Sequence, residues 1–227
     1  MPTVGNKVTK ERSGAFERQR DVATVRYFEE IGVSQGWRCL EIGGGKGTIA
    51  EWLGQRVGHA GQVVATELDT TSLEAIVSPN IEVRRHNVVE DVLEIDYYDL
   101  VHVRYVVLHL KEWEDVVKKL IASLKPGGWL FTEDPDLDGF MCDAATDELD
   151  RPIIVRHFDA VRQMMSSVGM DMNFGSNTLQ AFKANKLEFL RSESVSHVVF
   201  GGSEAAEIFR PSDEQKAMLV SAGLVTG

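Results

Sequence analysis

The amino-acid sequence predicts an α/β fold: a Rossmann-like, doubly wound and mostly parallel sheet, with helices on both faces and an antiparallel strand near the C-terminus. Short apolar runs alternate with amphipathic helical windows from Trp37 onward, which is typical of parallel sheets. One of these runs leads directly into a glycine-rich turn that opens a helix. The 227 residues suffice for one sizeable domain and are too few for two.

The core elements follow from this alternation. The expected parallel strands are Trp37–Ile42, Gln62–Glu67, Ile81–His86, Tyr98–Val103 and Trp129–Glu133. The expected helices between them are Thr48–Val57, Thr71–Val77 and Trp113–Leu124. Proline and glycine stop a helix, so Lys125-Pro126-Gly127-Gly128 should end the last of these and turn the chain into the fifth strand.

Further elements flank this core. Phe16–Ile31 carries a rough apolar stripe before it, and helices are expected at about Ile153–Val168 and Thr178–Asn185 after it. The antiparallel strand is expected at Leu187–Ser192, with an extension through Phe200. Ser203 is the expected N-cap of a final helical stretch.

Composition excludes several classes of function. A net charge of −11 and an isoelectric point near 5.0 argue against a nucleic-acid partner, because phosphate binding needs a positive surface. No apolar run approaches the ~20 residues of a membrane span, and the N-terminus lacks the apolar stretch of a secretory signal. Cys39 lies in an apolar strand pattern, so a buried, reduced thiol is expected. We therefore expect a cytoplasmic protein without a membrane partner.

The glycine turn, Gly43-Gly44-Gly45-Lys46-Gly47, is the most informative segment. Glycine permits positive φ and close backbone approach, so a ligand can lie against bare main chain. The helix that follows presents unpaired N–H groups to such a ligand. Alone, this turn fits nucleotide-binding domains of several kinds, and also a tight turn that binds nothing.

Two acidic residues narrow the choice of ligand. Glu41 lies two positions before the first glycine, where a carboxylate suits a cationic ligand and is poorly placed for a pyrophosphate. Glu67 ends the second strand, at the spacing after the glycine turn where a carboxylate can accept both hydroxyls of a ribose. The pair indicates a ligand that carries both a positive charge and a ribose.

These residues resemble class I S-adenosylmethionine-dependent methyltransferases. The segment 41–47 is similar to the family's first motif, an acidic residue followed by G-x-G-x-G, and the segment 63–69 is similar to the second. The segment 86–89 matches the loop that contacts the adenine amino group. The segment 98–104 resembles the fourth-strand motif, which approaches the methionine portion, and 124–128 is a habitual entry to the fifth strand.

The resemblance implies S-adenosyl-L-methionine as cofactor, S-adenosyl-L-homocysteine as product, and a small-molecule methyl acceptor. It places Glu67 on the ribose, Leu68 against the adenine and Asn87 on the adenine amino group, where the family more often has aspartate. The implied cofactor-binding residues are Glu41, Gly43, Gly44, Gly45, Glu67, Leu68, Asn87, Val88, Val103 and Arg104.

The resemblance also organises the chain as one methyltransferase domain. It has an N-terminal helical cap over 1–36, a cofactor-binding core over 37–136, and substrate-side helices with the last strand over 137–227. The family's sheet normally closes with a sixth and a seventh antiparallel strand, and we find no convincing seventh. Either the chain is naturally short, or it is truncated, or a partner supplies the edge. Because an unpaired edge favours pairing with another chain, a homodimer is one expectation.

Methyl transfer needs a base only where the acceptor must lose a proton. His109 is the first candidate base, because it follows the fourth strand where the substrate should enter; a capping or packing role is the alternative. Asp136 is the second, from the carboxylate-rich segment after the fifth strand, which could equally be a solvated loop. His102 is expected to be buried structure. No histidine spacing supports a dedicated metal site, and none is expected.

Three other functions compete with this interpretation. A nicotinamide-dependent oxidoreductase shares the glycine turn, but its G-x-G-x-x-G pattern fails at Thr48. A protein that binds S-adenosylmethionine without methylating is compatible with every motif, because these motifs report binding and not turnover. Methylation of RNA or protein is disfavoured by the acidic charge.

Overall fold

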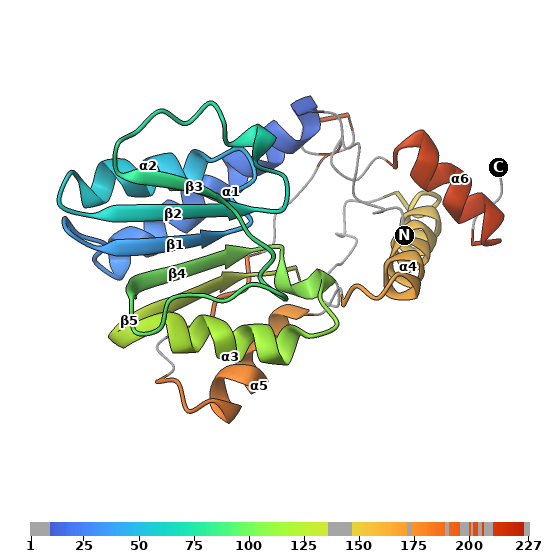
Figure 1. Cartoon of the computed structure of the whole chain (residues 1–227). Helices are drawn as coiled ribbons and strands as arrows, with labels where there is room; N and C mark the ends of the chain where they lie inside the picture. Colours follow the sequence, from blue (N-terminus) through green and yellow to red (C-terminus); the bar gives the residue numbers. More distant parts are fainter. Residues whose placement is uncertain are drawn as a thin grey trace. The chain divides into compact units, whose positions relative to one another are not determined.

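The computed structural model contains a five-stranded parallel sheet (Figure 1). The structure describes residues 10–135, 147–171, 174–188, 191–195, 200, 202–203, 206 and 211–224. The strand order is β3-β2-β1-β4-β5, and all four pairings are parallel. The chain therefore runs outward from β1 to β3 and restarts beside β1 with β4. The predicted doubly wound parallel sheet is confirmed.

The first half of the chain follows the predicted alternation. Its elements in order are α1 (Lys10–Glu30), β1 (Arg38–Ile42), α2 (Thr48–Val57), β2 (Gln62–Glu67), the 3-10 turn η1 (Thr70–Ser72), β3 (Ile81–Arg85) and β4 (Tyr98–Arg104). The remaining elements are η2 (Val107–His109), α3 (Trp113–Ser123), β5 (Leu124–Glu133), α4 (Arg151–Ser167), α5 (Phe174–Ala184) and α6 (Asp213–Ser221).

The helix predicted at Thr71–Val77 is wrong. Only the short turn η1 forms there, capped by Asp69, which accepts hydrogen bonds from the Thr71 backbone N–H and hydroxyl. The apolar residues of the window serve another purpose, since Leu73 is fully buried and lies against Gly44 and Gly47. They pack under the glycine turn and do not form a helix face.

The start of β5 also differs from the prediction. Residues 125–128 belong to the strand, because β5 pairs with β4 from Leu124 onward, with a shift in register between Tyr98 and Leu100. Gly127 adopts a φ of 81°, which glycine permits. A proline is tolerated here because β5 is an edge strand of the described sheet.

The predicted C-terminal elements are partly confirmed. Helices α4 and α5 lie where amphipathic windows were expected. In the segment expected to form the antiparallel strand, residues 187–188, 191–195 and 200 are not strand, and the others lie outside the described residues. Ser203 accepts a hydrogen bond from the Ala206 N–H, but the final described helix begins later, behind a capping box formed by Ser212 and Gln215.

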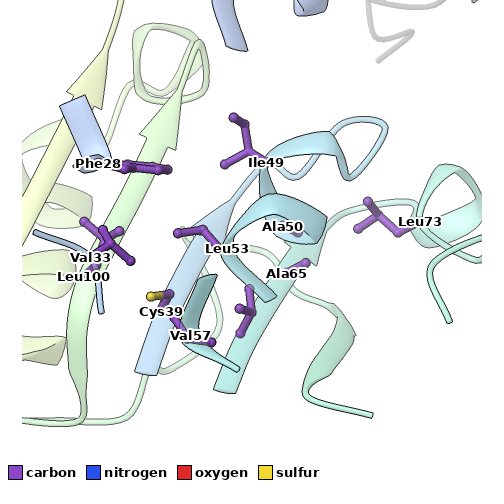
Figure 2. Packing of buried hydrophobic residues seen from close by; sticks show 11 residues of the cluster. Phe28, Val33, Cys39, Ile49, Ala50, Leu53, Val57, Ala65, Leu73 and Leu100 are labelled. Carbon is purple, nitrogen blue, oxygen red and sulfur yellow. The ribbon is translucent and has the colours of Figure 1, made fainter. Parts of the chain in front are cut away.

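The core beside the glycine turn lies between the sheet and the helices α1 and α2 (Figure 2). Alternate strand residues point to this face, so Cys39, Val63 and Leu100 meet Phe28 of α1 and Leu53 of α2. Cys39 is fully buried, as predicted. Helix α3 packs against β4 and β5. The result is a rigid base for the loops at the carboxyl ends of the strands.

The chain divides into two compact units. One comprises Asp21–Pro135 and Phe174–Phe189, and it contains the whole sheet. The other comprises Met1–Arg20, Asp136–Asn173 and Leu190–Gly227. Within the second unit, α4 and α6 pack through Ala160, Met164 and Leu219. None of the described helices is both long and apolar enough to cross a membrane.

Candidate cofactor-binding and active site

The glycine turn joins β1 to α2 at the carboxyl edge of the sheet. Gly43, Gly45 and Gly47 have φ values of 74°, 56° and 83°, in the left-handed region that disfavours other residues. The N–H groups of Gly43 and Gly44 donate to the Thr66 carbonyl at 3.0 and 2.9 Å. The turn is therefore tied to the end of β2.

Space, as well as φ, requires glycine in this turn. A Cβ at Gly43 would lie 2.4 Å from Val106 Cγ2, and one at Gly47 would lie 2.4 Å from Ile76 Cδ1. At Gly44 the nearest atoms would be Leu73 methyls at 3.4 Å, an ordinary contact. The turn thus offers its main chain to a ligand at positions where side chains do not fit.

The Glu67 carboxylate is fixed beside this turn. Its Oε1 accepts a hydrogen bond from Gly45 N–H at 3.0 Å, and its Oε2 accepts one from Leu68 N–H at 3.2 Å. Ser72 Oγ donates to the Gly45 carbonyl at 2.6 Å and holds the same turn. Each carboxylate oxygen has further acceptor capacity, so a held carboxylate can still accept two ribose hydroxyls. The neighbouring Leu68 side chain is 61% exposed, available to an adenine ring.

The loop after β3 is shaped by its own polar groups. Asn87 Oδ1 accepts from Val89 N–H at 3.1 Å, and Asn87 N–H donates to Asp91 at 2.8 Å. Lys119 Nζ of α3 donates to the carbonyls of Val88, Val89 and Asp91. This loop is therefore anchored to α3 beside the turn, with Val88 buried within it.

A buried ionic network lies at the ends of β1, β4 and β5. His102 Nδ1 is 2.6 Å from Glu41 Oε2, and His102 Nε2 is 3.0 Å from Glu133 Oε1. Burial alone lowers the pKa of His102, but the two carboxylates outweigh it and raise that pKa to about 9. The contact with His102 lowers the pKa of Glu133 despite its burial. At neutral pH this pKa favours the positively charged imidazolium form of the ring.

Helix α1 joins this network. Thr24 Oγ1 donates to Glu133 Oε1 and accepts from Arg104, whose other terminal nitrogen donates to Asp21 at 2.7 Å. Arg104, which was predicted to bind the cofactor, thus forms hydrogen bonds with two residues of α1. Its neighbour Val103, also predicted to bind the cofactor, is fully buried. The prediction that His102 is buried is confirmed, because its side chain is 0% exposed.

The chain bends sharply after β4. Tyr105 has a φ of 55°, a strained value for a residue with a side chain, and its N–H donates to the Glu133 carbonyl at 2.9 Å. This bend brings Val106 over Gly43. Strain of this kind is found where surrounding structure fixes a functional loop.

The described acid–base groups at this edge differ in ionisation. His109 lies in η2 on the surface, and desolvation lowers its pKa, so its ring is neutral and can accept a proton. Asp134 has two enclosed carboxyl oxygens without a hydrogen-bond partner among the described residues. Burial, followed by repulsion from Glu133, raises its pKa to about 7. Asp136, the second predicted base, lies outside the described residues.

Comparison with known proteins also indicates a methyltransferase domain. A family model described as a methyltransferase domain matches residues 10–199. The chain belongs to the family of class I S-adenosylmethionine-dependent methyltransferases. The cofactor of such a methyltransferase is S-adenosylmethionine.

Individual relatives are distant. The methyltransferase str2 of Strobilurus tenacellus is 28% identical over 158 residues, which cover 69% of this chain and 55% of that protein. The ubiquinone/menaquinone biosynthesis C-methyltransferase UbiE of Pseudomonas fluorescens is 29% identical over 111 residues, 45% of this chain and 43% of that one. The chain spans about half the length of the curated relatives it matches.

A solved structure supports the fold. The YcgJ protein of Bacillus subtilis superposes with a TM-score of 0.57 at 15% identity, over 83% of this chain and 77% of that one. At this identity the likeness concerns the fold alone.

The residues of the turn fit the family's cofactor. Gly43, Gly44 and Gly45 carry no side chains, so a nucleoside can approach the main chain of the turn closely. The fixed Glu67 carboxylate suits ribose hydroxyls, and the Glu41 carboxylate beside the turn suits a cation. Among the described residues, no group of His, Cys, Asp and Glu is arranged to hold a metal ion.

Sequence analysis did not foresee the contacts that His102 makes in this site. Glu41 and His102 are register partners on adjacent strands, and both side chains point to the α1 face of the sheet. Aligning the predicted strands side by side would have brought these two residues together. Nothing in the sequence indicated that Glu133 reaches the same ring.

Proposed function

We propose that this methyltransferase moves a methyl group from S-adenosylmethionine to a small-molecule acceptor with an oxygen, nitrogen or carbon nucleophile. The observation that carries the proposal is the glycine turn with Glu67 fixed against it, since Gly45 N–H donates to that carboxylate at 3.0 Å. This arrangement is preorganised for a ribose next to bare main chain.

The acceptor class is supported by charge and by relatives. A net charge of −11 opposes binding to RNA or DNA, because nucleic-acid binding requires neutralisation of phosphates. The similarity to UbiE, a C-methyltransferase of ubiquinone and menaquinone biosynthesis, favours a small molecule over a macromolecule. The similarity to str2 is compatible with a role in secondary metabolism.

The residues of the chain would divide the work as follows. Glu67 and Leu68 would hold the ribose and adenine, with Asn87 and Val88 at the adenine edge, and the turn would hold the rest of the cofactor against its main chain. When bound, S-adenosylmethionine supplies an electrophilic methyl group on a sulfonium.

The acceptor side needs orientation above all, because in-line displacement depends on alignment of the nucleophile. The neutral ring of His109 can take a proton from an acceptor that carries one. Asp136 remains the second proposed base. The cytoplasm is the proposed location, and a homodimer the proposed assembly.

The test uses cofactor carrying a tritiated methyl group. The purified chain is incubated with it and, separately, with a small-metabolite extract, bulk tRNA and histone peptides. We expect label to enter the small-molecule fraction alone. Label in tRNA or peptide would overturn the acceptor class. Tight cofactor binding with label transfer to no fraction would favour a protein that binds S-adenosylmethionine without methylating.

A further inference from the structure

We propose that His102 is a positioning residue for the amino-acid end of the cofactor, because it clamps Glu41 beside the glycine turn to Glu133 at the end of β5. This inference rests on the proposed function, in that S-adenosylmethionine is the ligand of the turn. It concerns the half of the ligand that Glu67 does not reach.

The geometry favours a charged ring. Each ring nitrogen of His102 faces one carboxylate oxygen, at 2.6 Å for Glu41 and 3.0 Å for Glu133. A neutral imidazole has a single N–H and can donate to only one ionised carboxylate, whereas the doubly protonated ring donates to both. The ring is fully buried. It stacks on the Phe131 ring, with the two ring centroids 5.4 Å apart, and meets the Phe28 ring edge-on, with the centroids 5.1 Å apart. Its orientation is therefore fixed by packing as well as by hydrogen bonds.

Among the described residues around this ring, carboxylates outnumber cations. Glu41 comes from β1, His102 and Arg104 come from β4, Glu133 ends β5, and Asp134 follows it. Asp21 of α1 pairs with Arg104 at 2.7 Å, so among these residues His102 faces both glutamates. Buried negative charge is costly unless a positive group compensates it. The ammonium at the amino-acid end of the cofactor, or its sulfonium, is such a group.

Without His102 the two glutamates would repel each other. Two carboxylates that share a buried site do not both stay ionised, so one takes up a proton or turns away. Glu41 would then no longer present a fixed charge beside the turn. The nucleoside half is held elsewhere, by Glu67 on β2 and by the glycine main chain. Loss of His102 should therefore weaken binding of the amino-acid end and spare the nucleoside end.

Two ligands separate these halves. S-adenosylhomocysteine carries both, whereas 5′-methylthioadenosine has the same nucleoside and thioether but no amino-acid end. We compare wild type, His102→Gln and the control His59→Gln by calorimetry at pH 7.5. His59 is an exposed histidine between α2 and β2, away from the carboxyl edge.

The expected result for His102→Gln is at least a tenfold weaker affinity for S-adenosylhomocysteine and less than a twofold change for 5′-methylthioadenosine. His59→Gln should match wild type for both. A merely structural role would weaken both ligands together and would overturn the inference, as would an unchanged affinity for both. If wild type binds neither ligand, the proposed function itself fails, which is a different outcome.

A measurement on wild type covers the case in which His102→Gln does not fold. Nitrogen NMR of histidine rings at pH 8 should show one doubly protonated ring, at a pH where ordinary histidines are neutral. Its signals should shift with S-adenosylhomocysteine and stay in place with 5′-methylthioadenosine. The absence of a doubly protonated ring, or an equal response to both ligands, would contradict the role of His102.

Discussion

Two parts of the site at the carboxyl edge of the sheet hold their carboxylates in different ways. At β2, the Glu67 carboxylate is held by backbone N–H groups of Gly45 and Leu68, and it lies close to the surface. At β1, β4 and β5, Glu41 and Glu133 are held by the buried ring of His102. One end is built from main chain over a short stretch of sequence, and the other from side chains of three strands.

The difference explains why the two ends should respond differently to change. A carboxylate held by main-chain donors keeps its place when distant side chains change, because the fold itself supplies the donors. A carboxylate held by an imidazolium depends on the protonation of one ring. We therefore expect ligand contacts at the nucleoside end, beside Glu67, to change little with pH. Contacts at the amino-acid end, beside Glu41 and Glu133, should change with pH.

The largest effect is expected at the turn that serves both ends. Gly43→Ala places a Cβ 2.4 Å from Val106 at a φ of 74°, so it should lower the free energy of unfolding by about 1–3 kcal/mol and abolish cofactor binding. Gly44→Ala is the matched control, since its Cβ meets Leu73 at 3.4 Å and its fold should be retained. Thermal unfolding and calorimetry with S-adenosylhomocysteine measure both. Equal stability of the two variants would show that the close approach at Gly43 is unimportant.

The next effect isolates the nucleoside end. Glu67→Ala removes a charge-assisted acceptor of the ribose and should weaken binding by about 1–3 kcal/mol. In contrast to His102→Gln, it should weaken S-adenosylhomocysteine and 5′-methylthioadenosine alike. Glu90→Ala, an exposed glutamate in the loop after β3, serves as control. A selective loss of S-adenosylhomocysteine alone in Glu67→Ala would mean that the two ends are assigned the wrong way round.

His102, at the amino-acid end, should make the free energy of unfolding depend on pH. The folded-state pKa of His102 is raised to about 9 from its ordinary value of 6.5, so its stabilising contribution is fully present below pH 6.5 and is lost as pH rises through 9. Chemical denaturation of wild type between pH 6.5 and 9.5 should show this decline, and His102→Gln should flatten it. A decline of the same slope in both proteins would rule out His102 as its source.

Asp134 should change the free energy of unfolding over a lower range of pH. Its pKa is raised from 3.8 to about 7, so the protonated carboxyl stabilises the fold at low pH and this contribution is lost as pH rises from about 4 through 7. Asp134→Asn should remove that decline and make the protein more stable than wild type at pH 7.5. Asp96→Asn, at an exposed position before β4, should leave the curve unchanged.

The smallest effect concerns the buried thiol of Cys39 in β1. Burial, and then repulsion from Asp99 and Glu41, raises the pKa of Cys39, so the thiol stays protonated. Cys142 is the other cysteine of the sequence, so the test uses a Cys142→Ser background. In that background the native chain should not react with iodoacetamide at pH 8, whereas the unfolded chain should react. Rapid labelling of the native chain would show that the packing around β1 opens readily.

The sheet and the position of Glu67 beside the glycine turn could be predicted from sequence because their signals are local. Glu67 follows the glycine turn by a fixed spacing, and the strand β2 was predicted with its observed bounds. The failure at Thr71–Val77 has a tertiary cause: Leu73 is buried under the turn and not on a helix face. Likewise Pro126 and Gly127 predicted a turn, but an edge strand accommodates them as an irregularity.

The amino-acid end was not predicted because its contacts are remote in sequence. His102 meets Glu41 across 61 positions and Glu133 across 31, and Thr24 meets Glu133 across 109. Neither periodicity nor a short motif carries information over such separations. A strand histidine between apolar neighbours therefore predicted burial correctly, without indicating its two acidic partners.

The central claim is that the turn after β1, with Glu67 fixed beside it, binds S-adenosylmethionine. Calorimetric titration of the purified, folded chain with S-adenosylhomocysteine tests it most directly, with NADH as the competing ligand. We predict saturable one-to-one binding of S-adenosylhomocysteine and none of NADH. A folded chain that binds NADH, or that shows no affinity for S-adenosylhomocysteine, would contradict the claim.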